Sequence, residues 1–109
     1  MSITKKAEEL GNALLQSSEY KELKAAEKNM QDDEAASKIL NEFESAQKRA
    51  QMQQMNGQQV GQELQNKLQS IQGQMKENSN IEEFMKTQKK FNELMKTVNQ
   101  VITSALQGN

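Results

Sequence analysis

The sequence predicts an all-α protein. The 109 residues contain no proline and only five glycines, so few helix breakers are present. Alanine, glutamate, lysine, glutamine, leucine and methionine dominate, and all favour helices. Apolar residues recur at spacings of three and four, which is the helical period. Since only 34% of the residues are apolar, we expect a single helical domain over residues 1–109 that completes a helical bundle by oligomerisation.

Two short amphipathic helices are expected first. The apolar face of the first comprises Ile3, Ala7, Leu10 and Leu14. Ser17 is suited to be the N-cap of the second, because its hydroxyl can accept a hydrogen bond from a free backbone N–H. The apolar face of the second comprises Tyr20, Leu23, Ala26 and Met30. Each helix is too short to be stable alone, so we expect both to dock on other elements.

A long central helix is predicted from Asp33 to Met75, with Asp33 as its N-cap. At 1.5 Å per residue it would be about 65 Å long, longer than a small domain is wide. Gly57 and Gly61 each disfavour a helix by about 1 kcal/mol relative to alanine. The apolar stripe keeps its phase across both glycines, which favours a helix that is continuous or bent near Gly57 over a break.

The last predicted helix follows a turn at Lys76–Asn80, with Asn80 as N-cap and Glu83 three residues later as a capping box. We expect this helix to fold back antiparallel to the second half of the central helix. Its apolar face comprises Ile81, Phe84, Met85, Phe91, Leu94, Met95, Val98, Val101, Ile102, Ala105 and Leu106.

The middle of the central helix is predicted to be the interface with a second subunit. No charged residue occurs from Ala50 to Gln62, and Met52 and Met55 lie off the main apolar stripe. Uncharged, methionine-rich surfaces with small residues are typical of buried contacts. The alternative is two scattered exposed methionines. The predicted interface consists of Ala46, Ala50, Met52, Met55, Gly57, Val60, Gly61 and Leu64.

No residue set indicates catalysis. Histidine and cysteine are absent, which removes the commonest general base, thiol chemistry and thiolate metal ligands. The acidic residues at Asp32–Glu34 are explained by a helix start rather than a metal site. We therefore expect no enzyme activity, metal or cofactor.

The charge pattern argues against direct nucleic-acid binding. The net charge is −1, and the only basic cluster, Lys86, Lys89, Lys90 and Lys96, is interleaved with glutamates. This is typical of a solvated helix face, and direct RNA binding through these lysines is the alternative.

No apolar stretch resembles a signal peptide or a membrane span, so we expect a cytoplasmic protein with no membrane contact. A secreted helical hairpin of the WXG type is disfavoured because tryptophan is absent.

Several short motifs in order resemble the YlbF/YmcA family, and most closely its YheA-type subgroup. They are Leu10-Gly11, Ser17-x-Glu19-Tyr20, Asp33-Glu34, Phe43, Gln47, Gln54-Met55-x-Gly57 and Asn80-Ile81. The resemblance implies a small cytosolic helical protein that self-associates and acts as a non-enzymatic adaptor or regulator. A purely structural self-associating protein is the alternative.

Family members YlbF and YmcA act with YaaT in a complex linked to ribonuclease Y, mRNA processing and development. The resemblance therefore implies a protein partner in RNA processing. That complex is associated with iron–sulfur clusters held by cysteines. Because this chain has no cysteine, it cannot hold such a cluster through its own thiols.

Overall fold

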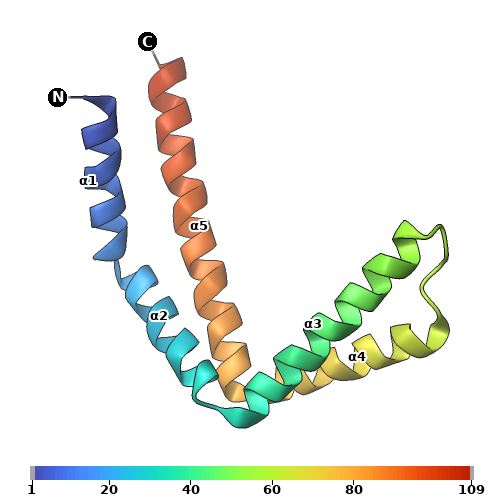
Figure 1. Cartoon of the computed structure of the whole chain (residues 1–109). Coiled ribbons are helices and arrows are strands. Elements are labelled where there is room, and N and C mark those ends of the chain that lie inside the picture. Colours follow the sequence, from blue (N-terminus) through green and yellow to red (C-terminus); the bar gives the residue numbers. More distant parts are fainter. Residues whose placement is uncertain (1, 109) are drawn as a thin grey trace. The chain divides into compact units, whose positions relative to one another are not determined.

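The computed structural model describes residues 2–108, and within this range it contains five helices and no strand (Figure 1). The predicted all-α class is therefore confirmed. The helices are α1 (Ile3–Leu15), α2 (Ser18–Gln31), α3 (Glu34–Met55), α4 (Gln62–Glu77) and α5 (Ser79–Gln107). Among the described residues, no helix has the length and apolar character needed to cross a membrane.

The chain divides into two compact units. Unit 1 contains the residues up to Glu27 and those from Phe84 onward, and unit 2 contains Lys28–Glu83. Unit 1 therefore holds α1, most of α2 and most of α5, whereas unit 2 holds α3 and α4.

Unit 2 is a helical hairpin in which α3 and α4 lie side by side (Figure 1). Ala46, Leu64 and Ile71 form its buried centre. The alanine on α3 leaves room for the larger side chains of α4, so the two backbones can approach closely. The half-buried residues around this centre are Ile39, Phe43, Ala50, Val60, Leu68 and Met75.

α3 is separated from α4 because α3 ends in a C-terminal capping motif at a glycine. Gly57 has φ +76°, a left-handed conformation that favours glycine. The Gln58 N–H donates to the Gln53 carbonyl at 2.9 Å, and the Gly57 N–H donates to the Gln54 carbonyl at 3.1 Å. This pair of hydrogen bonds is a Schellman motif, which satisfies two free carbonyls and ends α3.

The prediction of a continuous or merely bent central helix is therefore wrong. An apolar stripe that keeps its phase across Gly57 shows only that both segments bury one face. In a hairpin the two faces bury each other, so the same pattern fits two antiparallel helices. The expected packing of the last helix on this stretch also needs correction, because the helix that lies against α4 is α3.

Two of the three predicted N-caps are confirmed. Ser17 Oγ accepts a hydrogen bond from the Tyr20 N–H at 3.1 Å and donates to the Leu14 carbonyl at 2.6 Å, joining α1 to α2. Asp33 Oδ1 accepts from the N–H groups of Ala35 and Ala36 at the start of α3. The third prediction is wrong by two residues: Asn78, rather than Asn80, caps α5 by accepting from the Ile81 N–H at 3.0 Å.

The second oxygen of Asp33 ties the two turns of unit 2 together. Asp33 Oδ2 accepts from Asn80 Nδ2 at 3.0 Å and from Asn78 Nδ2 at 3.3 Å, across more than 40 residues of chain. The hydrogen bond from Asn80 is the largest of several that lower the pKa of Asp33. Hydrogen bonds to the charged carboxylate favour that form, which is why the pKa falls.

Unit 1 has few buried side chains. An aromatic contact joins α2 to α5, with the Tyr20 and Phe91 ring centroids 5.6 Å apart. The Lys24 ammonium lies 5.8 Å from the Tyr20 ring centre. Ala26 and Thr87 are buried, and the Thr87 hydroxyl donates to the Phe84 carbonyl. In α1, all of whose residues are described, none is buried.

Replacing Gly57 with alanine should lower the free energy of unfolding by about 1 kcal/mol, because an L side chain is strained at positive φ. A Cβ at Gly57 would meet nothing within 4 Å, so the change isolates backbone strain. Gly73→Ala, inside α4 and equally open, is the matched control and should raise stability by about 0.5–1 kcal/mol. Equal effects of both substitutions in urea unfolding would contradict the left-handed turn.

Stability should fall at acidic pH as Asp33 becomes protonated. Its pKa is lowered in the folded chain, so its contribution is complete above the usual aspartate pKa and is lost as pH falls through the lowered value. Asp33→Asn keeps an oxygen that can cap α3 but cannot titrate. The stability of this variant should therefore depend less on pH in this range. Thermal unfolding of both proteins between pH 5 and pH 2 measures the difference, and parallel profiles would count against the Asp33 interactions.

Candidate protein-interaction surface

The eight residues predicted for the interface fall into two groups in the structure. Four of them belong to the hairpin core: Ala46, Ala50, Val60 and Leu64. The other four are exposed at or beside the turn between α3 and α4: Met52, Met55, Gly57 and Gly61. The first group is already packed within its own chain, so only the second is open to a partner in this structure.

The exposed group lies in what we call the hairpin tip, residues 52–61, which also contains the half-buried Val60. Met52 and Met55 are 63% and 85% exposed. The loop is held by its own hydrogen bonds, from the Gly61 N–H to Gln53 Oε1 at 3.2 Å and from Gln65 Nε2 to the Val60 carbonyl at 3.0 Å. The tip therefore offers flexible, apolar methionine side chains beside an ordered loop with no charge.

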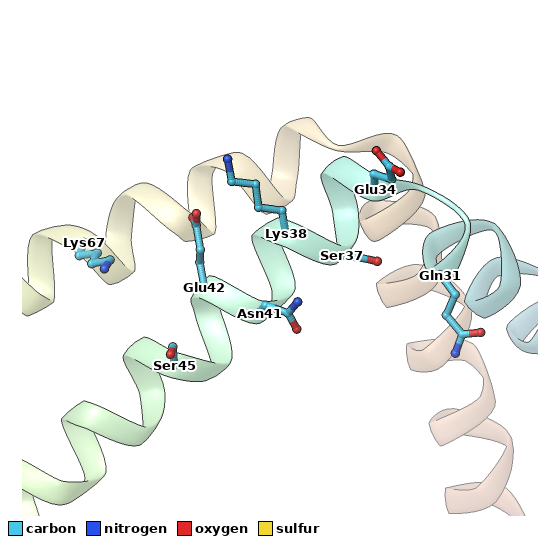
Figure 2. Close-up of a pocket in the computed structure, with 8 residues that line it drawn as sticks. All are labelled: Gln31, Glu34, Ser37, Lys38, Asn41, Glu42, Ser45 and Lys67. Carbon is cyan, nitrogen blue, oxygen red and sulfur yellow. The ribbon is translucent and has the colours of Figure 1, made fainter.

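A shallow hollow beside α3 does not have the character of an active site. Figure 2 shows most of its side chains spread along α3, with Gln31 from the end of α2 and Lys67 from α4, rather than converging on one point. Its lining mixes both charges and comprises Gln31, Glu34, Ser37, Lys38, Asn41, Glu42, Ser45 and Lys67. Within residues 2–108 no group of three or more acidic, histidine or cysteine side chains could hold a metal ion.

A second hollow lies near the tip, and its charged lining residues are Arg49, Glu63 and Lys67. It also includes Gly61, which is the N-cap of α4 without a side-chain hydrogen bond. The glutamate offsets part of the positive charge. Every buried polar side-chain atom among the described residues has a hydrogen-bond partner, so neither hollow contains a buried polar group left for a ligand.

The sequence reasoning did not single out the exposed apolar residues of unit 1, which we call the terminal surface. Six large side chains are exposed there, from α1 and the end of α5: Ile3, Leu10, Leu15, Val101, Ile102 and Leu106. The sequence contains a signal for it. Lys96 is the last charged residue of the chain, yet the apolar pattern continues for ten residues beyond it.

The fold and the surfaces define a small all-helical protein equipped for protein contacts. The model of the YlbF/YmcA family, described as "Control of competence regulator ComK, YlbF/YmcA", matches residues 3–107. The chain therefore belongs to this family, and the family resemblance seen in the sequence is confirmed.

The chain is also similar to curated relatives and, in its fold, to a solved structure. The chain is 32% identical over 100 residues to the UPF0342 protein SH1117 of Staphylococcus haemolyticus, covering 92% of this chain and 88% of that protein. A UPF0342 protein of Staphylococcus epidermidis is 31% identical with the same coverage. The fold is similar to the crystal structure of Bacillus subtilis RicA in complex with RicF, with TM-score 0.82, 20% identity, and 97% and 94% of the two chains covered.

The division of the predicted interface into core and tip can be tested by truncation. Leu64 is 5% exposed, so Leu64→Ala should lower the free energy of unfolding by about 2–5 kcal/mol. Met55→Ala removes an exposed side chain at the tip, and should change it by less than about 0.5 kcal/mol. Urea unfolding of the two variants measures both, and a larger loss for Met55→Ala would reverse the assignment.

Proposed function

We propose that this protein is a non-enzymatic adaptor or regulator that acts by contacting a partner protein through the hairpin tip. The observation that carries the proposal is the exposure of Met52 and Met55 beside an ordered, uncharged loop. Exposed methionines on an uncharged surface suit helix or loop partners of varied shape, because the side chain is flexible and polarisable.

Family membership supports the regulatory part of the proposal, because the family description names control of the competence regulator ComK. The similar RicA structure is of a complex with RicF, which supports a protein partner. We extend the proposal to a cytoplasmic, self-associating protein of the YheA-type subgroup with a partner in mRNA processing. This extension rests on the motifs that carry the family resemblance.

Placing a charge on each tip methionine should abolish partner binding while leaving the fold intact. In Met52→Glu/Met55→Glu, each carboxylate would lose water on binding with no counter-charge provided by the tip. The measurement is affinity capture of tagged wild-type and variant chains from the native host, with quantitative mass spectrometry. We expect at least one protein to be recovered with the wild type and reduced at least about tenfold with the variant.

Gln47→Glu/Gln51→Glu is the matched control, since it adds the same charge at exposed positions of α3 outside the tip. It should recover the same proteins as the wild type, and circular dichroism should show equal helix content in all three chains. Identical recovery with the tip variant would remove the tip from the proposal. Recovery of RNA with no protein dependent on the tip would favour the alternative, RNA binding by the exposed lysines Lys86, Lys89, Lys90 and Lys96 of α5.

A further inference from the structure

The methionine thioethers are the most readily oxidised groups of this protein. The chain contains seven methionines and no cysteine, tryptophan or histidine. Thioether sulfur is soft and polarisable, and peroxides convert it to the sulfoxide. Because no thiol competes, a peroxide that reaches this chain reacts at methionine sulfur.

The methionines differ widely in their access to solvent. Met55, Met52 and Met85 are 85%, 63% and 51% exposed. Met30 is buried, with 9% of its surface exposed, and Met75 is half-buried against the core of the hairpin. A peroxide must reach the sulfur to oxidise it, so the rates of oxidation should follow the exposed fractions. The two methionines of the hairpin tip are therefore expected to react first.

Oxidation changes the tip more than it changes any other surface. Met52 and Met55 are three residues apart in the last turn of α3, so they are neighbours on one side of the helix. No residue from position 50 to position 62 is charged. A sulfoxide is polar, so oxidation of this pair turns an apolar surface into a polar one. Met85 differs, because Glu82 and Lys89 already place charges on its side of α5.

The fold does not depend on the two sulfur atoms at the tip. Neither Met52 nor Met55 belongs to the core of the hairpin. The hydrogen bonds that hold the loop use backbone groups and the side chains of Gln53 and Gln65. Oxidation of Met75 would instead place a polar group against the core. The methionines that react first are thus those whose oxidation leaves the helices intact.

From these observations we propose that Met52 and Met55 form a reversible oxidation site that controls partner binding at the hairpin tip. This rests on the proposed function, because it names the regulation of the same surface. A sulfoxide oxygen buried against an apolar partner loses its hydrogen bonds to water, which lowers the affinity. The reduced tip binds its partner, and the oxidised tip releases it.

Both steps of the cycle balance with a peroxide and a thiol reductant. A lone pair of the methionine sulfur attacks a peroxide oxygen, the S–O bond forms and the O–O bond breaks. The sulfur loses two electrons, and hydrogen peroxide is reduced to water. In the reverse step two thiols are oxidised to a disulfide, and the sulfoxide oxygen leaves as water.

The site itself is tested by treating the full chain with hydrogen peroxide and following each methionine by peptide mass spectrometry. Met55 should react about ten times as fast as Met30, in the ratio of their exposed fractions of 85% and 9%, and Met52 should follow Met55 closely. Circular dichroism should show unchanged helix content while only the tip pair is oxidised. Equal rates at Met55 and Met30, or a loss of helix as the tip reacts, would overturn the proposal.

The control of binding is tested by affinity capture with reduced chain, with oxidised chain freed of peroxide, and with oxidised chain repaired by methionine sulfoxide reductases. The host lysate is first freed of small thiols, so that the sulfoxides persist. Recovery of the tip-dependent protein should fall at least about tenfold on oxidation and return on repair. Met52→Leu/Met55→Leu keeps an apolar tip of similar volume, and its recovery should resist peroxide. Met85→Leu is the matched control and should lose recovery as the wild type does.

The failure of this proposal and the failure of the proposed function give different results. A tip-dependent protein recovered equally with reduced and oxidised wild type would overturn the oxidation switch and leave the proposed function standing. Loss of recovery with oxidised Met52→Leu/Met55→Leu would also overturn the switch, because the sensitive methionine would then lie outside the tip. Recovery from untreated chains that Met52→Glu/Met55→Glu does not change would contradict the proposed function, and the control of binding with it.

Discussion

The structure of unit 2 depends on the carboxylate of Asp33. One oxygen caps α3, and the other accepts the side-chain amides of Asn78 and Asn80 from the turn that follows α4. The residue where α3 begins is thereby joined to the residues where α4 ends, which closes one end of the hairpin. The Schellman motif at Gly57 closes the opposite end of the hairpin. Polar interactions thus fix both ends of a helix pair whose middle is apolar.

Closure at both ends matters because the apolar middle is thin. Its buried members are one alanine, one leucine and one isoleucine, with half-buried residues around them. The burial of so few apolar side chains is small against the conformational entropy of ordering two helices and a loop. Hydrogen bonds that fix the register of α3 against α4 therefore decide whether this small core forms in one arrangement or in several.

Local signals in the sequence were sufficient for the helical class and for the caps at Ser17 and Asp33, because a cap depends on residues two or three positions away. Predictions from these local signals were wrong where contacts between residues distant in the sequence determine the structure. Asn78 and Asn80 are both plausible caps of α5 and both donate to Asp33, but the oxygen of Asn78 is the one that accepts from the Ile81 N–H. The prediction of one continuous helix, which rested on the apolar stripe from Ala46 to Leu64, was wrong for a similar reason. Periodicity reports that a face is buried and does not report which helix covers it.

The same limit explains why the predicted interface mixed two kinds of residue. Ala46 and Leu64 carry the signature of a buried face, and α3 and α4 bury them mutually. Ile3 and Val101 carry that signature too, and in their case the chain leaves the face open. The fold separates the two cases, and the pattern does not. α3 and α4 lie against each other and bury their apolar faces, whereas α1 has an apolar face of the same period and none of its residues is buried.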